Sequence, residues 1–433
     1  MVHSKNGVQT TTSSALNTKS EKTKLIVAAS IGNFLEIFDF TVYSFFAGII
    51  GQVFFKSEDW LTSLLFSVGV FGVGFVMRPL GSIMIGAYAD RKGRKAAMLL
   101  TILLMALGSA LIGFAPPASA IGIMAPILLV VGRLLQGFSA GGEIGAATTL
   151  LMESAERHQR GFFVSWQFIG QGLSSLTGSL MAASLTAVLS TEALHSWGWR
   201  VPFIFSLLII PVGLYIRAHI NETLEAESHT QQSSHPFAVL LDKHLLQTCL
   251  GVLYILPVTA LMYILIFYMP NYLKTVTTMG ESQTFLVTSY ASIIMIIFSI
   301  ISGFLCDKLE RRKPVALIIL LIALIASFFD FYFVATPTLF FIFHTIGIGC
   351  LGLLMTFSVL MIMEAFERSI RATATGVIYA FGVTIFGGTA QIIVTWLLKI
   401  SDKNIMAPFW YLGSALIIGI IAASLFHEKR HKR

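Results

Sequence analysis

Two acidic residues stand three positions apart in the segment GNFLEIFDF (32–40), which is otherwise almost wholly apolar. On a helix this spacing places Glu36 and Asp39 on one face. Two arginines, Arg78 and Arg133, lie in equally apolar surroundings farther along the chain. An ionisable side chain costs about 2.5–3.5 kcal/mol at the middle of a membrane span, so each of the four needs a reason to be there.

These four side chains could bind an anion and move a proton together. Two fixed arginines attract an anion and can hold a carboxylate through paired hydrogen bonds. A buried carboxylate beside an arginine can exchange a proton near neutral pH, because burial favours its neutral form and the arginine favours its charged form. Asp39 is the first candidate for the proton carrier and Glu36 is the second. The alternative is a set of ion pairs that only hold helices together.

Other polar and aromatic side chains in the apolar segments are candidates for the wall of a substrate cavity. Asn33 lies one turn before the acidic pair and could hydrogen-bond to either acid. We expect His344 to be a packed, hydrogen-bonded core residue and Asp330 to lie at the membrane interface. The candidates for substrate binding are Arg78, Arg133, Asn33, Tyr43, Gln136, Trp166, Gln167, Gln171, Tyr268 and Asn271.

Membrane-spanning helices are the elements that must hold these residues. Of the 433 residues, 55% are hydrophobic and 12% are charged, against roughly 25% charged in soluble domains. Apolar runs of about 20 residues recur, each long enough to cross a bilayer. The sequence predicts an all-α membrane protein with twelve spans near 25–52, 60–86, 96–115, 121–149, 161–189, 200–217, 244–273, 282–305, 314–333, 337–362, 376–398 and 405–426.

The distribution of basic residues predicts how the chain is oriented. With the N-terminus in the cytoplasm, the inside segments carry 22 Lys and Arg and the outside loops carry five. This bias favours both termini inside, as a multi-pass protein of the bacterial inner membrane. The predicted parts are a cytoplasmic tail (1–24), a six-helix bundle (25–217), a cytoplasmic linker (218–243), a second six-helix bundle (244–426) and a cytoplasmic tail (427–433).

Internal echoes indicate two related halves. GAYADRKGRK (86–95) after the second predicted span matches GFLCDKLERR (303–312) after the eighth, with Gly and Asp repeated at a separation of 217. MESAERHQR (152–160) matches MEAFERSIR (363–371) at a separation of 211. Such halves are typical of transporters that rock around a site at the bilayer midplane.

The repeated charges predict a gate that closes the cytoplasmic side. Acidic and basic side chains in one loop would pair with charges at the inner end of the fourth predicted span, and a glycine would allow the tight turn. The second half would repeat the network, although Glu310 stands where a glycine is usual. The predicted gate consists of Asp90, Arg91, Gly93, Arg94, Glu153 and Arg160, and of Asp307, Arg311, Arg312, Glu364 and Arg371.

GAYADRKGRK resembles the loop signature of the major facilitator superfamily, G-x-x-x-D-R-x-G-R-[RK]. Together with GNFLEIFDF, RPLGS, GRLLQGFSAGGEIG, WGWRVPF and IFGGT, it makes the whole chain similar to the metabolite:proton symporter family. The resemblance implies two pseudo-symmetric bundles, a monomer and alternating access. It also implies a role for Arg133 in proton or substrate handling, as in carriers for citrate, α-ketoglutarate, shikimate, and proline with betaine.

The function that follows is proton-coupled uptake of a small organic acid such as citrate, α-ketoglutarate or another di- or tricarboxylate. A zwitterionic compatible solute, proline or betaine, is the alternative, and sodium is the alternative coupling ion. The expected partners are the organic anion, the proton and the lipid bilayer, without nucleic acid. The sequence holds no nucleotide-binding motif, no metal-ligand spacing and no enzyme motif, so neither a cofactor nor enzymatic activity is expected. A receptor that binds without transport is the alternative from another class.

Overall fold

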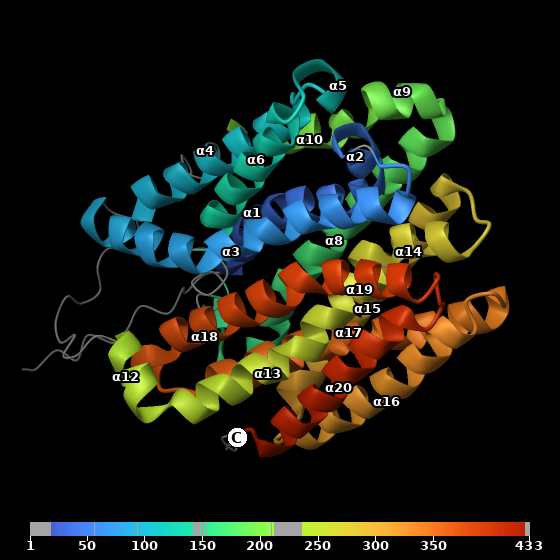
Figure 1. Cartoon of the computed structure of the whole chain (residues 1–433). Coiled ribbons are helices and arrows are strands. Elements are labelled where there is room, and N and C mark those ends of the chain that lie inside the picture. Colours follow the sequence, from blue (N-terminus) through green and yellow to red (C-terminus); the bar gives the residue numbers. More distant parts are fainter. Residues whose placement is uncertain are drawn as a thin grey trace, which may run out of the picture.

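The computed structural model describes residues 19–428, apart from residues 56, 93, 142–147, 149–150, 153, 209 and 212–235. Its helices form two bundles that lie against each other (Figure 1). The first contains α1 (Lys19–Phe45), α2 (Ala47–Phe54), α3 (Trp60–Lys92), α4 (Arg94–Gly113), α5 (Ala118–Ile121), α6 (Met124–Ala140), η1 (Arg157–Gln159), α8 (Arg160–Val188), α9 (Thr191–Ser196), η2 (Gly198–Arg200) and α10 (Val201–Ser206). The second contains α12 (Pro236–Lys243), α13 (Leu245–Leu261), η3 (Met262–Tyr268), α14 (Met269–Val276), α15 (Glu281–Lys308), α16 (Lys313–Tyr332), α17 (Pro337–Ala365), α18 (Arg368–Gly382), η4 (Val383–Gly387), α19 (Gly388–Ile400) and α20 (Ala407–Leu425).

The helices have the lengths and composition of membrane spans. Within the described ranges, seven helical segments are long and apolar enough to cross a bilayer, and a bent pair adds an eighth. The bent pair is Asn33–Phe45 with Ala47–Phe54, which meet at 62°. The sequence predicted one unbroken span over 25–52, because its apolar character continues through the bend. The prediction of an all-α membrane protein is confirmed.

Glycines let α3 and α6 approach closely enough to hold both arginines. A Cβ atom on Gly137 of α6 would lie 1.6 Å from the main-chain oxygen of Gly74 in α3. A Cβ on Gly141 would lie 2.0 Å from the main-chain oxygen of Arg78. A side chain at either position would push the helices apart, so this contact fixes where α3 and α6 present Arg78 and Arg133.

A proline inside α3 gives the two bundles a contact through the main chain. Pro79 has no N–H group, so the oxygen of Phe75, four residues earlier, lacks its helical partner. The hydroxyl of Thr384, in η4 of the opposite bundle, donates to that oxygen at 3.1 Å. The break in the hydrogen-bond ladder of α3 is therefore satisfied by the other half of the molecule.

Small polar residues join the bundles along α8 and α15. The hydroxyl pairs Ser179–Ser289 and Ser175–Ser292 are separated by 2.8 and 3.0 Å. Near the start of α15 and the end of α8, Ser282 donates to the main-chain oxygen of Ala183 at 3.0 Å. Small residues of this kind permit close packing of helices within a membrane, so α8 and α15 form an axis between the halves.

Candidate functional site

A cavity lies between the two bundles, with about 500 Å³ of space between its atoms, including its opening. Fourteen residues line it, and both halves of the molecule contribute. Nine of them are apolar and one, Arg78, is charged. The first bundle contributes Ile37, Arg78, Phe168 and Gln171, and the second contributes Ile255, Val258, Thr259, Met262, Tyr263, Phe267, Met355, Val359, Tyr379 and Val383.

Arg78 brings unused hydrogen-bond donors to this cavity. Its side chain is 3% exposed, and its Nε and Nη2 atoms have no hydrogen-bond partner among the described residues. The guanidinium carbon lies 4.5 Å from the ring centres of both Phe40 and Phe75. These rings hold the charge in place by cation–π attraction without occupying its N–H groups. Arg78 is therefore ready to receive an acceptor from the cavity.

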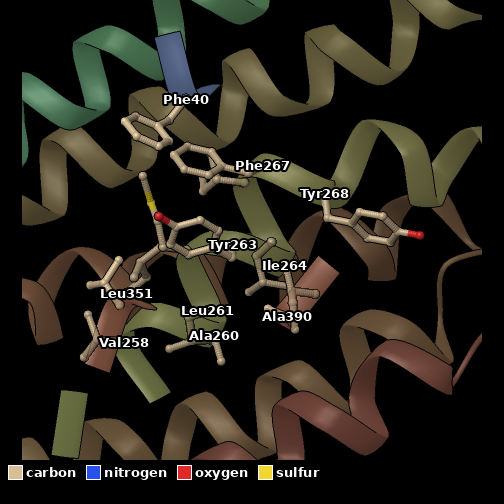
Figure 2. Packing of buried hydrophobic residues seen from close by; sticks show 14 of the residues in the cluster. Phe40, Val258, Ala260, Leu261, Tyr263, Ile264, Phe267, Tyr268, Leu351 and Ala390 are labelled. Atoms are coloured by element: carbon tan, nitrogen blue, oxygen red, sulfur yellow. The ribbon is translucent and has the colours of Figure 1, made fainter. Parts of the chain in front are cut away.

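Phe40 connects the cavity to the second arginine. The guanidinium carbon of Arg133 also lies 4.5 Å from the Phe40 ring centre, and it lies 4.7 Å from that of Tyr43. The Phe75 ring contacts both Phe40 and Tyr263 of the cavity wall, with centroids 5.3 and 5.6 Å apart, and Figure 2 labels Phe40 and Tyr263 in one buried cluster. Arg133 is fully buried and does not line the cavity. The structure therefore places Arg78 on the wall and Arg133 behind it.

A chain of hydrogen bonds runs from Arg133 to Asp39. Arg133 Nη1 donates to Gln136 Oε1 at 2.7 Å, and Gln136 Nε2 donates to Ser109 Oγ at 3.0 Å. The Ser109 hydroxyl in turn donates to Asp39 Oδ2 at 2.6 Å. Asp39 Oδ1 has no hydrogen bond to a described residue, although Ser206 of α10 lies close to the carboxylate. Four buried side chains from α1, α4 and α6 thus form one polar network.

Ser109 can serve either protonation state of Asp39. Its hydroxyl also lies 3.0 Å from the main-chain oxygen of Met105, one turn earlier on α4. When Asp39 is ionised, the single hydroxyl hydrogen points to the carboxylate. When Asp39 carries a proton, that proton can bond to Ser109 Oγ, and the hydroxyl hydrogen turns to Met105. Neither state leaves a buried donor without an acceptor.

Glu36 is buried one turn before Asp39, at 2% exposure. Asn33, the predicted partner of these acids, is committed elsewhere. Its Nδ2 donates to the main-chain oxygen of Gln167 at 2.7 Å, and Gln167 Nε2 donates back to Asn33 Oδ1 at 2.9 Å. This reciprocal pair joins α1 to α8 within the first bundle.

The remaining predicted binding residues are dispersed. Of these, Gln171 lines the cavity, as does Tyr379 of the other bundle. Trp166 is half-buried against Phe162 and does not line it. Tyr268 points away from the rings around Phe40 (Figure 2) and accepts a hydrogen bond from Thr395 at 2.8 Å.

Asn271 lines a second, separate pocket, together with Trp60 and Lys274. Lys274 forms an ion pair with Glu281 and lies over the Trp60 ring, 4.4 Å from its centre. Trp60 belongs to the first bundle and the other three belong to the second, so this pocket also spans the two halves.

Asp307, predicted to belong to the gate, bonds across the two halves. Its Oδ1 and Oδ2 atoms accept hydrogen bonds from the main-chain nitrogens of Gly161 and Phe162, at 2.7 and 2.9 Å. These groups form the positive end of the α8 dipole, so the carboxylate caps a helix of the opposite bundle. Arg160, the first residue of α8, is half-buried beside this contact.

The structure brings together two of the other residues predicted for the gate of the second half. Arg312 forms an ion pair with Glu364 and donates from Nε to the main-chain oxygen of Cys306 at 3.0 Å. Arg371 donates to the main-chain oxygen of Met363 at 2.8 Å. Arg311 is exposed.

In the first half, Gly93 and Glu153 lie outside the described residues, as do the side chains of Asp90, Arg91 and Arg94. The backbone there differs from the predicted loop. Asp90 and Arg91 belong to helix α3, and Arg94 begins α4.

Asp330 lies two residues before the end of α16, and its side chain is enclosed by the protein, so a place at the membrane interface stays a prediction. Both Asp330 and His344 have 0% exposure, and His344 Nδ1 lies 3.0 Å from Asp330 Oδ2. The His344 ring stacks on Phe340, with centroids 5.1 Å apart. Packing of α16 against α17 encloses the pair, and the core role predicted for His344 is confirmed.

Several residues of the site were not predicted. Ser109 links Gln136 to Asp39, Phe40 contacts both arginines, and Tyr263, Tyr379 and Thr259 form the polar part of the cavity wall in the second half. The only available signal was a hydroxyl or an aromatic ring in an apolar helix, and such residues are common in any membrane core.

Comparison with known proteins agrees with this architecture. The family model described as Major Facilitator Superfamily matches residues 29–390 and 253–433. The proton:xylose symporter XylE superposes with a TM-score of 0.76 at 16% identity, over 95% of this chain and 97% of that one. The chain therefore belongs to the Major Facilitator Superfamily, a class of membrane transporters with twelve helices in two bundles, and is not an enzyme.

Relatives within the family have different named substrates. A citrate-proton symporter of Klebsiella pneumoniae is 32% identical over 93% of this chain and 91% of its own length. An alpha-ketoglutarate permease of Escherichia coli is 31% identical, over 93% of both chains. A proline/betaine transporter of Salmonella typhimurium is also 31% identical, over 94% of this chain and 84% of its own. Identity alone does not separate these substrates.

Proposed function

We propose that the protein is a proton-coupled symporter that takes up a small organic acid across the bacterial inner membrane. The observation that carries the proposal is Arg78, a buried cation on the wall of a cavity between the halves, whose Nε and Nη2 donors are unpaired among the described residues. Carboxylates bind arginine through such N–H groups. The named functions of the citrate and alpha-ketoglutarate relatives support this class of substrate.

The proton would be carried by Asp39 or Glu36. Ser109 supports both protonation states of Asp39, because its hydroxyl has two acceptors within reach. The opposite charges of Arg133 and Asp39 attract each other, whereas the like charges of Arg133 and Arg78 repel each other. A proton on either acid weakens its hold on the arginines and leaves positive charge for the substrate. Proton and substrate then favour the same conformation, which is the condition for coupling.

Alternating access would use the contacts between the bundles. The bonds from Asp307 hold the halves together at the α8 N-terminus, and the charged residues around them form the proposed cytoplasmic gate. The excess of Lys and Arg in the predicted inside segments supports a cytoplasmic location for both termini. We propose that one chain is the transporting unit, because the cavity is built entirely from its two halves.

Uptake into proteoliposomes with an imposed pH gradient tests the proposal. Labelled organic acids should accumulate only when the outside is more acidic. Asp39→Asn and Glu36→Gln should separate binding from accumulation, whereas Lys403→Gln, at an exposed loop residue, should behave like the wild type. Accumulation that does not depend on the pH gradient would overturn proton coupling. Accumulation driven by a sodium gradient would show that sodium, in place of the proton, is the coupling ion.

A compatible-solute symporter is the second candidate. The cavity wall contains the rings of Phe168, Tyr263 and Phe267, and aromatic rings attract quaternary ammonium groups. The proline/betaine relatives match with similar identity. Uptake of glycine betaine without uptake of any organic acid would establish this candidate in place of the first.

A further inference from the structure

The cavity wall is unusual for a site that would hold several carboxylates. Among the described residues that line it, Arg78 is the only charged one, and nine are apolar. A guanidinium group pairs with one carboxylate through two parallel hydrogen bonds. A second carboxylate on the same ligand would face side chains such as Val258, Met262 and Val359. Those side chains offer no hydrogen bond in place of the water that the carboxylate would lose.

The remaining polar groups on the wall suit neutral oxygen atoms. Gln171, Thr259, Tyr263 and Tyr379 are uncharged donors and acceptors. Gln171 belongs to the first bundle and Tyr379 to the second, so both halves of the molecule supply such groups. A hydroxyl or keto group on a ligand could take up these bonds, whereas a charged group needs a counter-charge that they cannot supply.

The buried charges that the structure describes in the first bundle balance to zero. Among its described residues, the buried charged side chains are Arg78, Arg133, Glu36 and Asp39, two of each sign. A proton on either acid leaves one unit of positive charge in a region of low dielectric. One carboxylate at Arg78 neutralises that charge, and a second would leave an uncompensated negative charge. The balance holds whichever acid takes the proton.

We infer that the transported anion is a monocarboxylate with a largely apolar body, bound at Arg78 and carried with one proton. The inference rests on the proposed function, since it assumes that the cavity binds an organic acid. Within that class it excludes di- and tricarboxylates as preferred substrates. It also predicts that transport is electroneutral, because one proton and one negative charge move together.

Thermal unfolding of the purified protein tests the ligand class, since a ligand that binds the folded state raises the unfolding temperature. The probes are pentanoate, glutarate and tricarballylate, which carry one, two and three carboxylates, together with glycine betaine and the neutral pentanamide. Binding is measured rather than uptake because protonated short acids cross bilayers unaided. Pentanoate should reach half-maximal stabilisation at a concentration at least 10-fold below that of glutarate, and pentanamide should not stabilise.

Variants connect that result to Arg78. Arg78→Gln should weaken pentanoate stabilisation at least 10-fold, and Arg78→Lys, which keeps the charge if the first variant does not fold, should weaken it less. Lys403→Gln should match the wild type. In weakly buffered solution with a pH indicator, saturation with pentanoate should take up one proton per bound molecule; uptake of none or two would overturn the charge balance.

The outcomes separate this inference from the function on which it rests. Stronger stabilisation by glutarate or tricarballylate than by pentanoate overturns the monocarboxylate and leaves organic-acid uptake standing. Stabilisation by glycine betaine alone overturns both. If none of the probes stabilises the protein, the monocarboxylate inference fails, and organic-acid uptake is decided separately by the proteoliposome assay.

Discussion

Asn271 and Ser44 join the two halves of the transporter at the point where the first span bends. Asn271 Nδ2 donates to the main-chain oxygen of Ser44 at 2.9 Å. The Ser44 hydroxyl donates to the main-chain oxygen of Phe267 at 3.0 Å and accepts from Gln391 Nε2 at 2.7 Å. Ser44 lies two residues before the break at Phe46. It therefore makes three hydrogen bonds to the opposite bundle close to the bend.

Asn271→Ala should favour separation of the bundles at this end. The lost hydrogen bond is worth about 0.5–1.5 kcal/mol, so the separated population should rise roughly 2- to 10-fold. Spin labels at Ser57 and Lys403, both exposed on opposite bundles, would measure the distance distribution in a cysteine-free background. Asn404→Ala is the matched control because the Asn404 side chain accepts a hydrogen bond from the main-chain nitrogen of Met406 within its own loop. Equal distributions for the two variants would contradict the role of Asn271.

Asp307→Ala should loosen the cap on α8. Each hydrogen bond to a charged group is worth about 1.5–3 kcal/mol, so alkylation of the neighbouring Cys306, which is fully buried, should accelerate at least about 10-fold. Replacing Cys249 and Cys350 with alanine isolates this thiol. Asp307→Asn, which keeps one acceptor, should give an intermediate rate. Asp242→Ala, at an exposed acid of α12, should leave the rate unchanged, and no acceleration in Asp307→Ala would refute the cap.

Replacing one residue of the buried pair Asp330 and His344 should lower the free energy of unfolding more than replacing both. Asp330→Ala leaves His344 without its hydrogen-bond partner, at a cost of about 1–3 kcal/mol in the free energy of unfolding. Asp330→Leu combined with His344→Phe replaces both polar groups with apolar ones and should cost less than either single replacement. Unfolding by a denaturing detergent measures the four members of the cycle, which are the wild type, Asp330→Leu, His344→Phe and the double variant. Additive costs would show that the two residues do not depend on each other.

Asp59 should give the protein a measurable loss of stability in acid. The hydroxyl of Thr62 donates to its carboxylate at 2.6 Å and is the main cause that lowers the pKa of Asp59 below its ordinary value of 3.8. Because the folded state lowers this pKa, the stabilisation is present above about pH 4 and is lost as the pH falls through the folded value. Asp59 also pairs with Lys399 of the other bundle at 3.3 Å.

Asp59→Asn should therefore flatten the fall in unfolding temperature between about pH 5 and pH 3. The effect should stay below about 1 kcal/mol, because the side chains of Lys399 and Asp59 are 40% and 48% exposed and water screens their charges. Glu58→Gln, at the neighbouring exposed acid, is the control. Parallel curves for the wild type and Asp59→Asn would rule out this contribution.

The sequence predicts the helical class and the residues that carry charge into the membrane, because burying charge is costly enough to mark them. Arg78, Asp39 and Glu36 could be identified in this way. Their partners could not, since Ser109 is one hydroxyl among many and its bond to Asp39 joins residues 70 positions apart. Pairing of this kind depends on which helices lie side by side.

The predicted gate is a second case in which the sequence did not reveal the partner of a charged residue. Asp307 was expected to pair with basic side chains of its own half, because charge patterns reveal only side-chain partners. It instead binds main-chain amides of α8, groups that every residue carries and that no sequence pattern distinguishes. The bend at Phe46 escaped prediction for a related reason, since no proline stands within α1 or α2 to mark it.

Pro79 shapes how this transporter can be dissected by mutation. The oxygen that it frees on Phe75 belongs to the backbone, so replacing the Phe75 side chain leaves the acceptor for Thr384 in place. A scan that truncates one side chain of α3 after another would therefore overlook this attachment. It would emerge only when position 79 regains an amide hydrogen, or when Thr384 loses its hydroxyl.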